Sequence, residues 1–443
     1  MAASVFSSEL YNRLFPAGEA GRLFTDSAEV RAMQLVEGTL AKVQGQMGII
    51  PEESGLFIHR ASLEIPLDPG GLAAETEQNG VSVPGLVAAF RKAMEAPEHA
   101  QYLHWGATSQ DIIDTAQSLR LRQFLTLMEK GVKQMLRDLA KLAETHATLP
   151  MVGRTWGQDA TPTSFGGVVA QWGAPLLDLL AELPSLRDRV LWVSLSGAAG
   201  TGAAMGPQVT QLRAEMAKAL NLKDPGRTWH SDRGPILALA AWLSRLCASL
   251  GKFAEDLLLL TQSGIAEVSL SSTGGSSTMP QKQNPVQPSA IVALARHVSG
   301  LNASLQGAGL HRQERDGAAL FTEWLSLAPL CLSTASALEH AKALAADIHP
   351  NPGAMAKALQ NGGDLIYAEA LSFRLSAHLP RPEAQEATKA LCKQALADGS
   401  RLSDLARAAY PGLSFEGLFD PQHQMGEAPA LAHTFKVSVE NLD

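Results

Sequence analysis

Residues 272–285 read STGGSSTMPQKQNP and hold side chains suited to proton transfer. Two glycines and several hydroxyl residues come first, and a proline-framed Lys282 and Asn284 follow. A Gly/Ser-rich stretch is also typical of a flexible linker, but a linker has no need of a lysine and an asparagine between prolines. A mobile hydroxyl can transfer a proton while an ammonium and an amide stabilise the developing negative charge. The segment therefore indicates an acid–base site.

Three other segments interrupt the helical pattern with polar residues, namely HWGATSQD at 104–111, GRTWGQDATPTSFG at 153–166 and HRQERDG at 311–317. The first precedes a long helix, so its hydroxyls suit a helix N-cap, and the same groups can bind a carboxylate. The second places Arg154 in a glycine- and threonine-rich turn beside an indole and an amide, which favours polar recognition. The third alternates arginines with acids, which fits a salt-bridged helix end as well as a binding site.

The glycine-rich segment 197–206, GAAGTGAAMG, is similar to a dinucleotide-binding loop, but its last glycine is misplaced for GxGxxG. No alternating strands and helices surround it, so we do not expect it to bind a nucleotide. The sequence has no HExxH pair and no cluster with metal-ligand spacing, so no metal is expected.

Composition excludes several classes of protein. The chain has 443 residues, 46% hydrophobic and 18% charged, which predicts a globular protein with a large core. A formal net charge of −8 argues against nucleic-acid binding. Three cysteines without a CxxC pair predict a reduced, cytoplasmic setting. We expect no signal peptide and no apolar run of membrane-spanning length.

Helical periodicity dominates the chain and predicts an all-α fold. Two apolar stripes step by four and three residues, from Leu121 to Leu142 and from Leu239 to Leu260. Their seven-residue repeat suits long, nearly parallel helices in a bundle. We predict an N-terminal helical domain at 1–105, a central long-helix bundle domain at 106–350 and a C-terminal helical domain at 351–443. The last boundary follows from the prolines and glycine of residues 349–355, HPNPGAM.

The segment GSSTMPQKQNP matches in full the signature GSSxMPxKxN of the fumarase/aspartase superfamily, which the chain resembles over nearly its whole length. The segments YLHWGATSQDIIDTA, MVGRTWGQDATPTSFG and QERDGAALFTEW look most like the bacterial muconate cycloisomerases of that superfamily. The resemblance implies a three-domain, mostly helical fold, a homotetramer with active sites shared between subunits, and a small anionic polycarboxylate substrate. It implies no metal or organic cofactor.

Trp156 separates two activities within the superfamily. Adenylosuccinate and argininosuccinate lyases carry a histidine at this turn, and it acts as general acid for a nitrogen leaving group. In lactone chemistry the group that adds or leaves is a carboxylate of the substrate itself, a stable anion at neutral pH that needs orientation and no proton. The cycloisomerases resemble this chain in having tryptophan there, and the resemblance implies a reaction that interconverts 3-carboxy-cis,cis-muconate and 4-carboxymuconolactone, or that acts on a close analogue such as a sulfomuconate.

On this resemblance Ser276 is the predicted proton-transfer residue, and Lys282 and Asn284 are predicted to stabilise the enolate-like intermediate. Residues expected to contact the substrate are His104, Thr108, Ser109, Arg154, Thr155, Trp156, Gln158, Ser277, Met279 and Arg315. A structural role for His104 remains an alternative.

Two other functions stay open at this point. A lyase of adenylosuccinate or of another fumarate-releasing substrate would share most of these segments, and Trp156 argues against it. A non-catalytic structural relative is the alternative of a different class, since crystallins have been recruited from this superfamily. The intact serine segment and Lys282 argue against that alternative.

Overall fold

A computed structural model describes residues 4–271, 273–275 and 278–442. The chain is 66% helical and 5% strand, which confirms the predicted all-α fold. The longer helices are α1 (Asp26–Gln46), α2 (Glu52–Glu64), α4 (Val83–Met94), α6 (Ser109–Thr145), α7 (Phe165–Val190), α8 (Val209–Leu220), α9 (Gly234–Leu260), α10 (Val286–Ala308), α11 (Gly317–Ala345), α14 (Arg381–Asp398) and α16 (Ala428–Glu440). Shorter helices are α3 (Ala73–Asn79), α5 (Pro97–Ala100), α12 (Pro352–Gln360), α13 (Ala368–Ser376) and α15 (Leu402–Ala409).

The chain divides into two compact units, each built from segments that lie far apart in the sequence. The first unit comprises Met1–Gly131, Leu179–Ala248 and Ala293–Glu339, and the second comprises Val132–Asp178, Ser249–Val292 and His340–Asp443. The helices α6, α7, α9, α10 and α11 each contribute residues to both units. The predicted boundaries near residues 105 and 350 stay a prediction.

The two apolar stripes lie where the periodicity predicts them. Leu121, Leu125 and Met128 on α6 are buried, and so are Leu243 and Leu250 on α9. A stripe that recurs every three and four residues faces one side of an α-helix, so each stripe faces neighbouring protein. This burial accounts for helices far longer than the roughly 12 residues of an average helix.

The expectation that no apolar segment reaches membrane-spanning length is wrong by length and composition. The helices α9 and α11 are both long and apolar enough to cross a bilayer. The core helix of a water-soluble protein meets the same criterion, and more than half of each apolar window is already buried within the protein. Burial among protein helices is therefore a sufficient reason for their composition.

Strands are few and short. The hairpin of β1 (Pro150–Thr155) and β2 (Gln158–Ser164) is antiparallel, with Arg154 opposite Asp159 and a register irregularity between Val152 and Arg154. The strands β3 (Val268–Leu270) and β4 (Ile348–Pro350) form a second antiparallel pair. Both pairs belong to the second unit.

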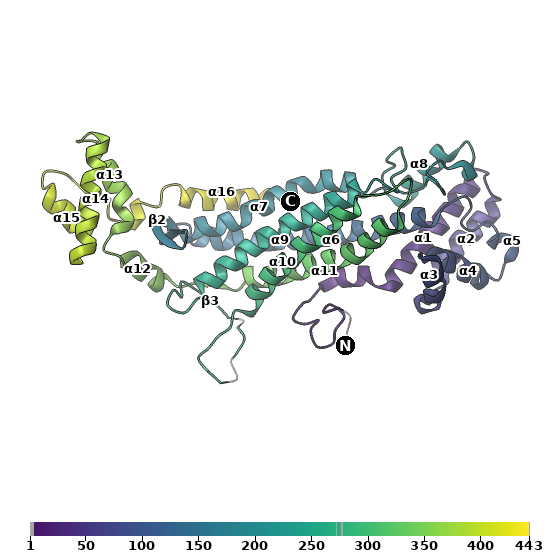
Figure 1. Ribbon diagram of the computed structural model, residues 1–443, viewed down its shortest axis with the longest axis horizontal. Helices are drawn as coiled ribbons and strands as arrows, with labels where there is room; N and C mark the ends of the chain where they lie inside the picture. The colour runs from purple at the N-terminus through teal and green to yellow at the C-terminus, as the bar shows by residue number, and fades with distance from the viewer. Residues whose placement is uncertain (1–3, 272, 276–277, 443) are drawn as a thin grey trace. The chain divides into compact units, whose positions relative to one another are not determined.

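The C-terminal helices α13, α14 and α15 group together in Figure 1. Their shared core includes Leu371, Leu375, Leu402, Ala406 and Phe415. The segment 271–285, which carries the GSSTMPQKQNP motif, joins β3 to α10.

Candidate active site

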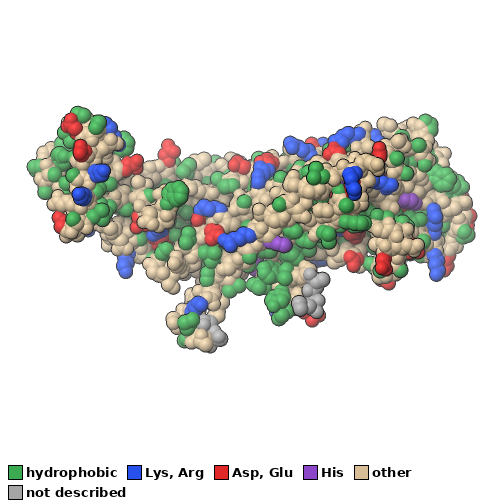
Figure 2. Space-filling model, viewed as in Figure 1, with side chains coloured by type: hydrophobic (Ala, Val, Ile, Leu, Met, Phe, Trp, Pro, Cys, Tyr) green, Lys and Arg blue, Asp and Glu red, His purple; other side chains and the backbone are tan. Residues whose placement is uncertain are grey.

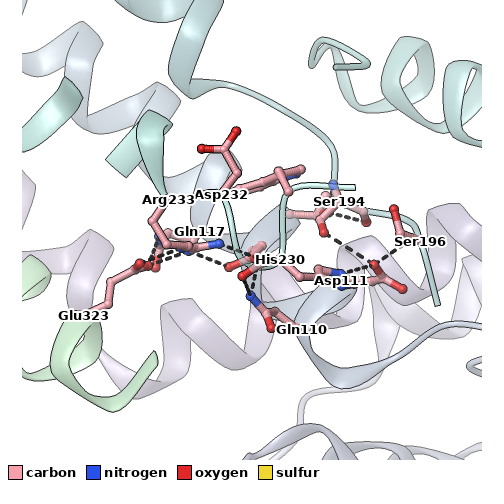
Figure 3. A network of polar contacts seen from close by, with 12 residues as sticks. Gln110, Asp111, Gln117, Ser194, Ser196, His230, Asp232, Arg233 and Glu323 are labelled. Atoms are coloured by element: carbon pink, nitrogen blue, oxygen red, sulfur yellow. Dashed lines mark hydrogen bonds and ion pairs between the residues drawn. The ribbon is translucent and has the colours of Figure 1, made fainter. Parts of the chain in front are cut away.

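The start of α6 is fixed by one buried carboxylate, that of Asp111. It accepts hydrogen bonds from the backbone N–H of Thr108 at 3.1 Å, Ser196 at 2.8 Å and Gly197 at 2.9 Å. The Nε2 atom of His230 lies 2.8 Å from the same carboxylate. Figure 3 shows Ser196 and His230, from two segments distant in the sequence, converging on Asp111. The carboxylate compensates unpaired N–H groups at the helix start and ties Thr108 to the glycine-rich segment.

A second buried cluster lies one helical turn further along α6. The carboxylates of Asp114 and Glu323 each accept two hydrogen bonds from Arg233, at 2.7–3.0 Å. The Arg233 guanidinium also lies 4.7 Å from the centre of the Trp229 ring. Gln117 donates to Glu323 at 3.1 Å. Burial raises the pKa of Asp114 although Arg233 opposes the shift. Figure 3 shows Arg233 and Gln117 against Glu323. The cluster joins α6, α11 and the residue that precedes α9, all within the first unit.

The structure brings together two of the residues predicted to bind carboxylates. Arg315 donates from Nη1 to the Thr108 hydroxyl oxygen at 2.6 Å, although they are 207 residues apart. A threonine hydroxyl that accepts one bond can still donate its own hydrogen, so a guanidinium and a hydroxyl are available at one point. Ser109 begins α6 beside them. Arg312, by contrast, pairs with Asp316 at 2.6 Å, which confirms the salt-bridged helix end expected for the 311–317 segment. A binding role for Arg315 stays a prediction.

His104 lies in the same unit and is held by an acid. Its Nδ1 is 2.6 Å from the Glu37 carboxylate, whose side chain is fully buried. Burial opposes a charge on the imidazole, but the Glu37 carboxylate outweighs it and raises the pKa of His104. His104 also has a φ of +63°, in the left-handed region that few non-glycine residues occupy. A strained backbone and a buried ion pair together fix this imidazole in one position.

Trp156 occupies the tip of the β1–β2 hairpin and is fully exposed, at 101% of its reference area. Trp156 and Gly157 both have positive φ, +56° and +74°. Two positive φ angles in a two-residue connection are those of a type I′ turn, where asparagine and glycine are preferred. An indole in this position is conformationally unfavourable and gains nothing from the hairpin itself. A residue that strains the backbone and stays exposed is a candidate for binding another molecule.

Arg154, two residues before Trp156, already has carboxylate partners within the protein. Its Nη1 and Nη2 donate to the two oxygens of Glu267 at 2.6 and 2.8 Å, and its Nε lies 3.2 Å from Asp159. Hydrogen bonding to Glu267 raises the pKa of Arg154. The other hairpin residues predicted to bind, Thr155 and Gln158, face one another across the turn.

The serine-rich segment is closed at its base by backbone pairing. Gly274 and Asn284 exchange two hydrogen bonds, N–H to carbonyl, at 2.9 and 2.8 Å. A side chain at Gly274 would place its Cβ 2.7 Å from a methyl group of Val286, so Val286 would have to shift to admit it. Lys282 and Met279 are exposed. The predicted Ser276 and Ser277 lie outside the described residues.

The predicted residues are divided between the two units. His104, Thr108, Ser109 and Arg315 belong to the first unit, and Arg154, Thr155, Trp156, Gln158, Met279, Lys282 and Asn284 belong to the second. Among the described residues, no group of three or more His, Cys, Asp or Glu side chains is arranged to hold a metal ion.

The sequence interpretation missed the acids that organise these groups. Glu37, Glu267 and Glu323 are all buried, and each pairs with a cation or histidine far away in the chain. One signal was present, because Glu37 and Glu323 each interrupt an apolar helical stretch. A buried charge in such a stretch requires a partner.

Comparison with known proteins identifies the family. A protein-family model described as "Lyase" matches residues 63–300. A "3-carboxy-cis,cis-muconate cycloisomerase" of Acinetobacter baylyi is 33% identical over 432 residues, which cover 95% of this chain and 96% of that protein. A protein of the same name from Pseudomonas aeruginosa is 33% identical over 439 residues, covering 97% and 96%. The chain therefore belongs to the fumarase/aspartase superfamily of lyases.

A solved structure agrees with this assignment. The "3-carboxy-cis,cis-muconate lactonizing enzyme from Pseudomonas putida" matches with a TM-score of 0.90 and 31% identity, covering 98% of this chain and 99% of that one. The fold expected from the GSSxMPxKxN signature is thereby confirmed.

Proposed function

We propose that the chain is a 3-carboxy-cis,cis-muconate cycloisomerase, an intramolecular lyase that interconverts 3-carboxy-cis,cis-muconate and 4-carboxymuconolactone in protocatechuate-type aromatic catabolism. The relatives named above support this activity, and they resemble this chain over nearly its whole length. The observation that carries the proposal within this chain is Trp156, an exposed indole on a strained turn.

The chemistry explains why an indole is suitable there. A lyase that expels an amine needs an acid to protonate it. In lactone formation a carboxylate oxygen of the substrate adds to its own double bond, so no external group is expelled. A flat, rigid ring can hold the substrate folded with its carboxylate close to the ring-closing carbon. Trp156 therefore provides a surface for orientation where amine lyases provide a proton.

The proposed ring closure joins a substrate carboxylate to the substrate's own double bond. One substrate carboxylate forms the C–O bond, and the electrons of the double bond move to the carbon next to another carboxylate. Lys282 and Asn284 stabilise this enolate-like charge, and Ser276 delivers its proton to that carbon. The serine regains a proton from solvent. Because one ionised carboxylate becomes an ester, each closure takes up one proton.

Carboxylate binding is assigned to the described polar groups of the first unit. Arg315 and Thr108 already converge at 2.6 Å and together present a guanidinium and a hydroxyl. The neighbouring start of α6 adds the positive end of a helix dipole, which favours an anion. We include Ser109 and His104 here, the latter as a cation fixed by Glu37.

We also propose a homotetramer whose active sites combine segments of several subunits, in the cytoplasm. Besides its buried face, α11 carries a second apolar stripe at Ala318, Phe321, Leu325 and Leu332, and Phe321 and Leu325 are exposed. A helix that is apolar all round is usually buried all round. Hydrophobic side chains also interrupt the polar surface on the face shown in Figure 2. Association of copies would cover these side chains.

Trp156→His tests the assignment because it should slow lactonisation but speed up cleavage of adenylosuccinate. For lactonisation the imidazole supplies an acid that is not needed and a smaller surface, so we expect a loss of ~1–3 kcal/mol in transition-state stabilisation, about ten- to a hundred-fold in rate. For adenylosuccinate cleavage the imidazole should help. Trp156→Phe is the matched control, because it keeps a flat ring without adding an acid, and it should retain more lactonisation than Trp156→His. Wild-type cleavage of adenylosuccinate that Trp156→His improves would refute the proposal.

A further inference from the structure

The contact between Arg154 and Glu267 has features of a structural clamp. Glu267 is fully buried, with a side-chain exposure of 0%, and both its oxygens accept from Arg154. Removing the guanidinium would leave a buried charge without its cation, which is costly. A substrate carboxylate would have to compete with this pair for the same two nitrogens. The geometry therefore disfavours Arg154 as a substrate-binding residue.

Glu267 is itself held by its backbone. Its carbonyl accepts a hydrogen bond from the Asn351 N–H at 2.8 Å, and the Asn351 side chain donates to the Ala266 carbonyl at 3.2 Å. Ala266 has a φ of +48°, in the left-handed region. This anchored segment leads directly into β3, which pairs with β4. Glu267 is thus a fixed point to which the hairpin is attached.

The hairpin needs such an attachment. A two-stranded hairpin is marginally stable on its own, and the register irregularity next to Gly153 weakens its pairing further. Arg154 lies at this irregularity and contacts Glu267 on one side and Asp159 of the opposite strand on the other. Because Trp156 is fully exposed, its own packing cannot fix its position. Only the backbone of the hairpin can do so.

We propose that Arg154, Glu267 and Asp159 form a clamp that sets the position of the hairpin tip, so that Arg154 is a positioning residue that acts through Trp156. The inference rests on the proposed function in one respect, namely that Trp156 contacts the substrate. A displacement of about 1 Å in a positioning group can cost about a hundred-fold in rate. Loosening the clamp should therefore lower kcat/KM to a similar degree.

The first test is a mutant cycle through Trp156. Arg154→Lys, which keeps the charge and loses the two-nitrogen contact, and Glu267→Gln should each lower kcat/KM by about ten- to a hundred-fold in the wild-type background. In a Trp156→Ala background, either change should cost less than about two-fold, because the group that the clamp positions is gone. Equal losses in the two backgrounds would overturn the proposal.

If Arg154 instead bound the substrate directly, Glu267→Gln would have a different effect on KM. Glu267→Gln would then free the guanidinium and lower KM, whereas the clamp predicts a fall in kcat/KM like that of Arg154→Lys. A lower KM in Glu267→Gln would therefore also overturn the proposal. Asp159→Asn is the milder variant, since Asp159 is half-exposed and its loss leaves the buried pair intact. It should give a smaller change of the same sign.

The second test does not require turnover. Hydrogen exchange of the backbone amides at 152–160 should accelerate at least ten-fold in Arg154→Lys and Glu267→Gln. The matched control is Glu182→Gln, because Glu182 contacts two guanidinium nitrogens of Arg245 on the protein surface. This variant should leave the hydrogen exchange at 152–160 unchanged. Unchanged exchange in the clamp variants would overturn the proposal. If the wild type fails to lactonise carboxymuconate, the proposed function fails, but the exchange experiment still decides the clamp.

Discussion

The sharpest stability prediction concerns the buried cluster in which Arg233 lies between Asp114 and Glu323. Four hydrogen bonds of 2.7–3.0 Å join the guanidinium to the two carboxylates, and all three side chains are buried. Arg233→Gln would leave two carboxylates close together without a cation. Removing one partner of a buried ion pair typically costs 3–5 kcal/mol, so we expect a loss of about 3–5 kcal/mol. Glu323→Gln instead leaves a one-to-one pair and should cost about 1 kcal/mol.

Thermal melting and urea unfolding at equal protein concentration, followed by circular dichroism, measure this asymmetry. For Arg233→Gln we expect Tm to fall by roughly 3–5 °C. The control Arg245→Gln breaks an exposed pair and should cost less than about 1 kcal/mol. The loss of stability in Arg233→Gln should shrink towards pH 5, because burial raises the pKa of Asp114 and its carboxyl group can then take up a proton. A smaller loss for Arg233→Gln than for Glu323→Gln would refute the reasoning.

Three further predictions follow from the other sites. Because the pKa of His104 is raised beside Glu37, their pair stabilises the fold below about pH 6.5 and loses this effect as pH rises through the folded-state pKa. His104→Gln should therefore flatten the fall of Tm between about pH 6 and 8. An unaltered slope of Tm against pH would contradict this. Ser276→Ala should lower turnover by about two orders of magnitude or more with little change in substrate affinity, and near-normal turnover would assign proton transfer elsewhere. Leu325 is exposed, and Leu325→Glu should break the proposed tetramer. Light scattering would then give a mass below four times 46.9 kDa. If the wild-type protein has the mass of a single chain, the tetramer is rejected.

The fold could be predicted because its signals are local and periodic. The stripes of α6 and α9 recur every three and four residues, and one face of a helix must be buried whatever its partner is. The start of α6 could be predicted for the same reason, since the hydrogen bond between the Thr108 N–H and the Asp111 carboxylate lies within one helical turn. Arg315 was singled out by its type and its neighbours in the sequence, and the structure places it against Thr108.

The ion pairs could not be predicted because their partners are distant in the chain. Glu37 is 67 residues from His104, and Glu267 is 113 residues from Arg154. No local periodicity encodes such a pairing. The consequence is clearest for Arg154, which was predicted to hold a substrate carboxylate, whereas the carboxylates that it contacts in the structure are those of Glu267 and Asp159.

The most direct test of the proposed cycloisomerase activity is to measure turnover of 3-carboxy-cis,cis-muconate and of adenylosuccinate by the wild-type protein. Each reaction is followed by ultraviolet absorbance and by proton uptake in a weakly buffered indicator solution. We expect loss of the muconate chromophore and no cleavage of adenylosuccinate. One proton should be consumed for each molecule closed, because an ionised carboxylate becomes an ester. Cleavage of adenylosuccinate with the muconate unchanged would contradict the proposed activity.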